Sequence, residues 1–272
     1  MRSSKKDVFR VGLTSDFMKP DGTIAYGDIG LSALDQADGV EWNFLDKQAE
    51  ISPEVADEYD ALIMLFGAVT KKTVQSAKRL SIVSRFGVGY DAIDVPACTE
   101  HGVILSTTVG ASTRPVSTIA MLYILATSHK LQDKDRIARS SSWDERANYM
   151  GVGLTGRTLC IVGLGNIGKD LAKLIQPFEM RVIAVDPYVK QKDASPLGVT
   201  LIGMEEAMKQ ADFVVVTAAL TEETRGLVGE KEFGLMKPSA FFINVARGPI
   251  ANQAALTRAL SEGRIAGAGL DV

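Results

Sequence analysis

The segment Gly163–Gly168 reads Gly-Leu-Gly-Asn-Ile-Gly and joins an apolar run to an amphipathic stretch. This G-x-G-x-x-G spacing, with a strand before it and a helix after it, predicts a dinucleotide-binding turn. Gly163 permits the tight turn, Gly165 lets the main chain approach a diphosphate, and Gly168 allows close packing of the helix on the strand. We expect the diphosphate at the helix N-terminus, where unsatisfied amides and the helix dipole favour an anion.

A carboxylate follows where such a site needs one. The next apolar run, Arg181–Val185, ends at Asp186, eighteen residues after Gly168. A carboxylate at this point can accept hydrogen bonds from both hydroxyls of an adenine ribose, and it repels a 2′-phosphate. No arginine occupies the next two positions, so we expect NAD rather than NADP. The alternative is an ordinary glycine turn followed by a solvated aspartate.

Short apolar runs alternate with amphipathic stretches along the chain, which is typical of βαβ units and of a parallel sheet with helices on both faces. In the first part of the chain we expect strands at Val8–Leu13, Val40–Leu45, Ala61–Leu65, Ser81–Phe86 and Val103–Leu105. In the second part we expect them at Thr158–Val162, Arg181–Val185, Phe213–Thr217, Ala240–Asn244 and Ile265–Val272.

A long helix is expected to link the two series of strands. The stretch Ser112–Leu131 has apolar residues at helical spacing and no glycine or proline after Pro115. The polar segment Gln132–Asn148 that follows is interpreted as an exposed arm, with Trp143 as its anchor on a neighbouring surface. We therefore predict an α/β protein of two doubly wound parallel-sheet domains, residues 1–108 and 109–272.

The composition excludes several classes of partner. With 46% hydrophobic residues and a net charge of -3, the chain of 272 residues has a core but no basic patch for nucleic acid or an anionic membrane. The stretch Met1–Lys6 is basic but precedes no apolar run, so we expect a cytoplasmic protein. Cys98 and Cys160 lack any metal-binding spacing and are interpreted as structural thiols. A small molecule is the expected partner.

Several longer motifs occur in order along most of the chain. Apart from the linking helix and the glycine turn, they are Arg85–Asp91, Leu154–Thr158, Met236–Pro238, Ile243–Gly248, Gly263–Gly267 and Leu270–Val272. Together they resemble the D-isomer-specific 2-hydroxyacid dehydrogenases, a family that includes phosphoglycerate dehydrogenase and glyoxylate or hydroxypyruvate reductases. The resemblance implies a flavodoxin-like substrate domain and a Rossmann domain that binds NAD. It also implies hydride transfer between nicotinamide and a small D-2-hydroxy acid or 2-oxo acid.

The resemblance also implies roles for residues outside the glycine turn. Arg247 is similar to the catalytic arginine of the family, whose planar guanidinium can hold a carboxylate and polarise a keto oxygen; the alternative is a surface ion pair. The amides of Val88 and Gly89 are expected to bind the substrate carboxylate, unless this segment is an ordinary glycine turn. Asp271 resembles the aspartate that accepts from the nicotinamide carboxamide.

The resemblance and the glycine turn together imply one set of cofactor-binding residues: Gly163, Gly165, Asn166, Ile167, Gly168, Asp186, Thr217, Ala219, Val245, Ala246, Arg247 and Asp271. The turn Thr217–Ala219 departs from the His-x-Pro of many relatives. Ser117 stands where many relatives have a glutamate, and Arg114 is interpreted as either a ligand contact or a solvated side chain.

The family mechanism also needs a histidine acid and a glutamate partner, both beyond Asp271 in the family, and the sequence ends at Val272. His101 is expected on the surface and His129 near the end of the linking helix, so neither replaces that acid. We expect a C-terminally truncated dehydrogenase that leaves apolar surface exposed. The alternative is a short form that binds NAD without turnover. A homodimer is expected by resemblance, and a small unphosphorylated acid is favoured as substrate.

Overall fold

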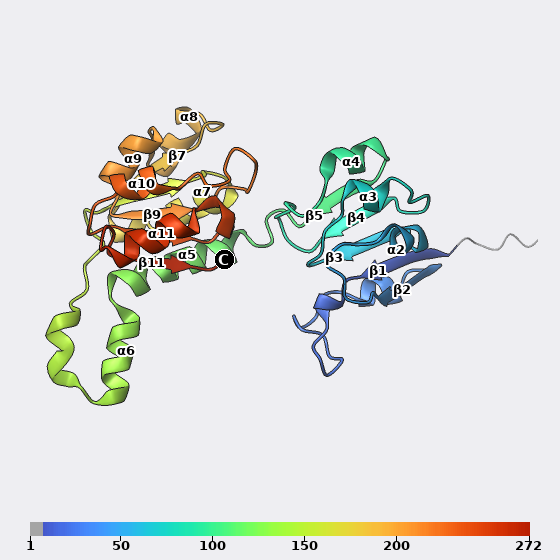
Figure 1. The fold of residues 1–272 in the computed structure, drawn as a ribbon, viewed down its shortest axis with the longest axis horizontal. Coiled ribbons are helices and arrows are strands. Elements are labelled where there is room, and N and C mark those ends of the chain that lie inside the picture. Colours follow the sequence, from blue (N-terminus) through green and yellow to red (C-terminus); the bar gives the residue numbers. More distant parts are fainter. Residues whose placement is uncertain (1–7) are drawn as a thin grey trace, which may run out of the picture. The chain divides into compact units, whose positions relative to one another are not determined.

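The computed structural model describes residues 8–272, which form two compact units (Figure 1). One unit ends at Ser112 and the other spans Thr113–Val272, so the division lies four residues after the position expected from the sequence. The basic stretch Met1–Lys6 lies outside the described residues. Because each unit has its own sheet and its own core, the two are described separately below.

The sheet of the first unit is parallel throughout, with strand order β2-β1-β3-β4-β5. Its strands are β1 Phe9–Leu13, β2 Val40–Phe44, β3 Ala61–Met64, β4 Ile82–Arg85 and β5 Ile104–Thr107. Its helices are η1 Ser15–Phe17, α1 Ser32–Asp35, α2 Pro53–Glu58, α3 Lys71–Val74 and α4 Val95–Glu100. This is the flavodoxin-like order that was predicted for the substrate domain.

The two faces of the first sheet are covered to different degrees. Leu62 and Val83 are fully buried in a cluster that includes residues of α2, α3 and α4. The other face carries a smaller cluster around Leu13 and Phe17. On β5, Ile104 is 62% exposed, although a strand of a parallel sheet is ordinarily buried on both faces.

The second unit contains a parallel sheet of strand order β11-β10-β9-β6-β7-β8. Its strands are β6 Thr158–Val162, β7 Arg181–Val185, β8 Val199–Leu201, β9 Phe213–Val216, β10 Phe241–Asn244 and β11 Gly267–Leu270. Its helices are α5 Thr113–Ser128, α6 Leu131–Ser140, η2 Trp143–Tyr149, α7 Asn166–Leu174, η3 Gln176–Phe178, α8 Gln191–Ala194, η4 Ser195–Leu197, α9 Met204–Gln210, α10 Glu230–Leu235, η5 Gly248–Ile250 and α11 Gln253–Ser261. This is the order of a Rossmann domain, and the predicted fold class is confirmed.

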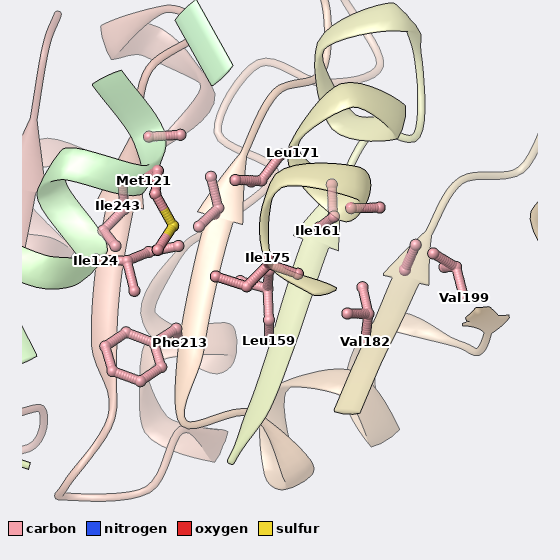
Figure 2. Close-up of a cluster of buried hydrophobic side chains, with 14 of the residues drawn as sticks. Met121, Ile124, Leu159, Ile161, Leu171, Ile175, Val182, Val199, Phe213 and Ile243 are labelled. Atoms are coloured by element: carbon pink, nitrogen blue, oxygen red, sulfur yellow. The ribbon is translucent and has the colours of Figure 1, made fainter. Parts of the chain in front are cut away.

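Two apolar layers hold the second sheet. On one face, Met121 and Ile124 of α5 and Leu171 of α7 pack against strand residues that include Leu159 and Phe213 (Figure 2). On the other face, residues of α9, α10 and α11 join Val214 and Phe242 in a second cluster. Because both faces of the sheet are covered, the loops at the ends of its strands begin from a well-packed core.

The linking helix is shorter than the sequence predicts, and the expected arm is largely helical. α5 ends at Ser128, where the carbonyl oxygen accepts a hydrogen bond from the amide of Val152 at 2.8 Å. Lys130 then adopts a left-handed conformation with φ of 51°, and α6 starts at the next residue. The prediction was wrong here because a residue distant in sequence ends the helix.

Most predicted strands are found within a few residues of their expected bounds, but β8 was missed because it has only three residues. Within residues 8–272, no helix combines the length and the apolar character that crossing a bilayer requires.

Candidate functional site

The strand order of the second unit reverses beside β6. The chain runs outward from β6 through β7 to β8, and then continues with β9 on the opposite side of β6. In open α/β sheets, ligands bind outside the carboxyl ends of the strands at such a reversal. The glycine turn follows β6 and the segment Thr217–Ala219 follows β9, so both lie at this point.

The glycine turn packs against the segment after β9 so closely that no side chain fits at Gly163. Its φ is +95°, and a Cβ atom there would lie 2.6 Å from the main chain of Ala218. A Cβ atom at Gly168 would lie 2.5 Å from the carbonyl oxygen of Gly163. The hydroxyl of Thr217 donates to that same carbonyl oxygen at 2.6 Å. These contacts fix the turn from two sides before any ligand binds.

Gly165 differs from the other two glycines of the turn. It is the N-cap of α7, it is exposed, and a Cβ atom built on it would meet nothing within 4 Å. Asn166, the first residue of α7, is also exposed, and Ile167 is half-buried. The start of α7 therefore exposes main-chain amides with no side chain over them, an open cradle that fits the diphosphate of a dinucleotide.

Asp186, the predicted ribose acceptor, is held by three main-chain amides. Its Oδ2 accepts from Leu164 of the glycine turn at 2.8 Å, and its Oδ1 accepts from Tyr188 at 2.9 Å and from Val189 at 3.2 Å. A carboxylate offers about four lone-pair positions, so these bonds leave room for a ribose hydroxyl. The side chain is thus a support of the turn as well as a candidate ligand residue, which the sequence did not indicate.

The loop after β10 carries the predicted catalytic arginine. Arg247 is half-buried, has an extended main chain with φ of -148°, and donates from Nη1 to the carbonyl oxygen of Ala246 at 2.7 Å. Val245 is 6% exposed, whereas Ala246 is half-buried. The buried side chain of Asn244 makes hydrogen bonds to Ala246 and Arg247. Asn244 belongs to the motif Ile243–Gly248, but the sequence alone indicates no role for it.

Asp271, the predicted nicotinamide residue, follows the edge strand β11. Its amide donates to the carbonyl oxygen of Asn244 at 3.0 Å, and its side chain is exposed. The hydroxyl of Tyr123 on α5 donates to Leu270 at 3.0 Å. A Cβ atom at Gly269 would lie 2.8 Å from the ring of Tyr123, so the ring is packed directly on the strand. β11 is thereby held in place from one face.

In the first unit, the segment Gly87-Val88-Gly89 follows β4. Val88 is 40% exposed, and within residues 8–272 neither its amide nor that of Gly89 donates a hydrogen bond to the protein. A Cβ atom at Gly87 would lie 2.9 Å from Nη1 of Arg85, so a guanidinium lies beside this loop. Two amides next to a cation form a site that fits a carboxylate. Arg85 is the last residue of β4 and the first of the motif Arg85–Asp91, but the sequence alone indicated no separate role for it.

Arg114 belongs to an ion pair within the second unit. Its Nη2 lies 2.8 Å from Oδ1 of Asp170 on α7, and the hydroxyl of Ser117 donates to Oδ2 of the same carboxylate. Burial raises the pKa of Asp170, but the hydrogen bonds from Ser117 and Arg114 outweigh it and hold the pKa below its ordinary value. The side chain of Arg114 is 62% exposed, so the solvated interpretation is closer to the structure, although the guanidinium also forms this ion pair.

The two histidines lie outside these loops. His101 caps the C-terminus of α4, at the amino end of β5 and so at the edge of the sheet opposite Gly87. It is half-buried, and its Nε2 is buried without a hydrogen-bond partner among the described residues, so the expected surface position was only partly correct. His129 is exposed just after α5. Within residues 8–272, no group of three or more acidic, histidine or cysteine side chains could hold a metal.

A family model and several curated proteins match most of this chain. Residues 121–272 match the family model of the D-isomer specific 2-hydroxyacid dehydrogenase, NAD binding domain. A glyoxylate reductase of Thermococcus litoralis is 37% identical over 226 residues, which are 80% of this chain and 68% of the relative. A D-3-phosphoglycerate dehydrogenase of Archaeoglobus fulgidus is 36% identical over 79% of this chain and 41% of its own length.

Solved structures agree at the level of the fold. The D-lactate dehydrogenase of Aquifex aeolicus, crystallised with NAD and lactic acid, aligns with 96% of this chain and 76% of its own, at a TM-score of 0.84 and 23% identity. The curated relatives named above are enzymes, which favours a dehydrogenase over the NAD-binding protein without turnover that the sequence left open. The chain therefore belongs to the family of D-isomer-specific 2-hydroxyacid dehydrogenases, and it is an NAD-dependent oxidoreductase of hydroxy acids.

Proposed function

We propose that this protein transfers a hydride between nicotinamide and C2 of a small, unphosphorylated D-2-hydroxy acid or 2-oxo acid. The observation that carries the proposal is the arrangement at one edge of the second sheet. There the open start of α7, the carboxylate of Asp186 and the loop that bears Arg247 all follow the carboxyl ends of strands. Nicotinamide supplies the hydride chemistry. The residues of the chain bind and orient the cofactor and the substrate, and they polarise the keto group of the substrate.

The cofactor is proposed to lie along this edge. The amides at Gly165, Asn166 and Ile167 hold the diphosphate, and Asp186 accepts from the adenine ribose with the lone pairs that its backbone bonds leave over. The surroundings of the nicotinamide half are assigned to Thr217, Ala219, Val245, Ala246 and Asp271. Among these, Asp271 accepts from the carboxamide and so determines which ring face meets the substrate.

Arg247 is proposed to hold the substrate carboxylate and to stabilise the negative charge that develops on the keto oxygen during reduction. A guanidinium suits both tasks because its donors form a planar fork and it remains charged at every relevant pH. The amides of Val88 and Gly89, with Arg85 beside them, are a second candidate contact for the carboxylate.

The function is tested by NADH oxidation with glyoxylate, hydroxypyruvate and phosphohydroxypyruvate, using the full-length protein. We expect oxidation with one of the two unphosphorylated acids. Arg247→Ala should lower kcat/KM by at least about a hundredfold, because the lost donors act on the developing charge. NADH affinity, measured by the fluorescence of the bound cofactor, should change little. Unaltered turnover in this variant would exclude the assigned role, and faster turnover of the phosphorylated acid would exclude the substrate class.

We also propose that the protein is a homodimer in the cytoplasm. The dimer is supported by a set of exposed apolar side chains on α5, α6 and the segment after them: Leu122 at 49%, Leu131 at 53%, Trp143 at 58% and Met150 at 71%. Exposed apolar groups that occur close together often mark a contact surface. Sedimentation should give twice the monomer mass at micromolar concentration, and Trp143→Ala with Met150→Ser should shift it toward the monomer. A monomeric wild-type protein would rule out the dimer.

A further inference from the structure

Asn244 is a buried polar residue at the end of a strand whose other residues are apolar. It is the last residue of β10, and only 1% of its surface is exposed. Its Oδ1 accepts from the amide of Ala246 at 3.0 Å, and its Nδ2 donates to the carbonyl oxygen of Arg247 at 2.9 Å. The side-chain amide thus spans the loop and binds the main chain on both sides of the bond between Ala246 and Arg247.

The main chain of Asn244 is also engaged at this edge. Its carbonyl oxygen accepts from Asp271 at 3.0 Å, and in the sheet it lies between Val216 of β9 and Leu270 of β11. The residue therefore connects the loop of Arg247 with the neighbouring strand end that carries Asp271. A substitution of Asn244 removes the side-chain bonds to the main chain around Arg247.

We propose that Asn244 is a positioning residue, which acts through Arg247 by fixing the main chain from which the guanidinium extends. The inference rests on the proposed role of Arg247. Only an amide side chain offers a donor and an acceptor on one short planar group, so neither aspartate nor serine can make both bonds in the same way. In catalytic sites, a misplacement of about 1 Å can cost on the order of a hundredfold in rate, so an unpinned arginine loses most of its effect.

The test measures the binding of oxamate, an unreactive analogue of a 2-oxo acid, to the complex of the full-length protein with NADH. Asn244→Ala removes both side-chain bonds, and Asn244→Ser keeps a hydroxyl that can make one of them. The matched control is Asn252→Ala in the same unit, which removes the bond from Ala255 to Asn252 Oδ1 at 3.0 Å, at the start of α11.

We expect oxamate affinity to fall by about tenfold or more in Asn244→Ala and by less in Asn244→Ser, while NADH affinity falls by a smaller factor. Asn252→Ala should bind oxamate as the wild type does. If Asn244→Ala does not give a cooperative melting curve, the serine variant carries the comparison. Wild-type oxamate affinity in a folded Asn244 variant would overturn the inference.

A double-mutant cycle separates positioning from a purely structural role. If Asn244 acts through Arg247, then Asn244→Ala should cause no further loss of oxamate affinity once Arg247→Ala is present. Additive losses would overturn the inference, because they would mean that the asparagine supports the site independently of the arginine. If Arg247→Ala alone leaves oxamate binding unchanged, the proposed function fails; if only the Asn244 variants leave it unchanged, this inference fails by itself.

Discussion

Gly163, Gly165 and Gly168 were assigned different roles from the sequence, and they occupy two kinds of environment in the structure. Gly163 and Gly168 are packed against Ala218, Thr217 and each other, and a Cβ atom at either would overlap main-chain atoms. A Cβ atom at Gly165 would meet nothing within 4 Å. Gly163 and Gly168 are therefore required by the fold. Gly165 is required only by a ligand that binds at the turn, such as the proposed diphosphate.

This difference predicts opposite results for two alanine substitutions. Gly168→Ala should lower the free energy of unfolding by about 2 kcal/mol, because its Cβ atom overlaps the carbonyl oxygen of Gly163. Gly165→Ala should leave the unfolding midpoint in urea nearly unchanged but lower NADH affinity by roughly tenfold or more, because the methyl group takes the place of the diphosphate. Unfolding curves and NADH titrations of both variants check this. Normal NADH binding by Gly165→Ala would contradict the proposed cradle.

At the scale of elements, α5 and α7 are joined by more than the apolar contacts in Figure 2. The side chain of Asp170 on α7 is only 14% exposed and binds both Arg114 and Ser117 of α5. α7 begins at the glycine turn, so this link connects the start of the linking helix to the helix that is proposed to hold the diphosphate. These polar contacts fix the register of α5 against α7. Apolar contacts alone would define that register less well, because they have no direction.

The pKa of Asp170 predicts how this link depends on pH. The pKa of Asp170 is held below its ordinary value, so the carboxylate stabilises the fold at neutral pH, and the contribution is lost as the pH falls through the lowered value. Asp170→Ala should therefore lower the free energy of unfolding by about 2 kcal/mol at neutral pH and by less in acid. Urea unfolding at several pH values measures both.

The control for this experiment is Glu205→Ala, which removes an exposed pair with Lys209 on α9 at 2.7 Å. Solvent screens such a pair, so we expect a much smaller change than at Asp170. A loss at Asp170 that stays the same from neutral to acidic pH would show that the charge of the carboxylate does not matter.

At the scale of the whole molecule, the two units have separate cores. The clusters of the second unit draw their residues from 116–268, and those of the first unit draw theirs from 11–105. Each unit therefore buries its own apolar surface, which is the physical condition for independent folding.

We predict that residues 113–272 fold by themselves and bind NADH. The expected result is a single cooperative unfolding transition and an NADH affinity within about tenfold of that of the full chain, because the proposed cofactor residues all lie in this unit. The same fragment with Gly165→Ala is the control; it should unfold similarly but bind NADH roughly tenfold or more weakly than the unchanged fragment. A fragment that lacks cooperative unfolding would show that the first unit completes its core.

The sequence alone determined the fold class, the cofactor and the position of the glycine turn. β6 and β7 have the bounds that were expected, because each is a short apolar run that ends at a turn signal. Such signals are local, since the residues that define a buried strand or a glycine turn are adjacent in the chain. The family motifs then supplied the candidate roles of Arg247 and Asp271.

Only the tertiary structure decided which contacts hold these residues in place. α5 ends where Val152 binds Ser128, Asp186 is fixed by the amide of Leu164, and Asn244 spans the loop that leads to Arg247. The first two of these join parts of the chain that are more than twenty residues apart. The third lies within four residues, but a sequence does not show which way a buried amide turns. The direction of a side chain and its distance from its partners arise from tertiary packing. For that reason the sequence indicates the candidate residues, whereas the structure shows which contacts support them.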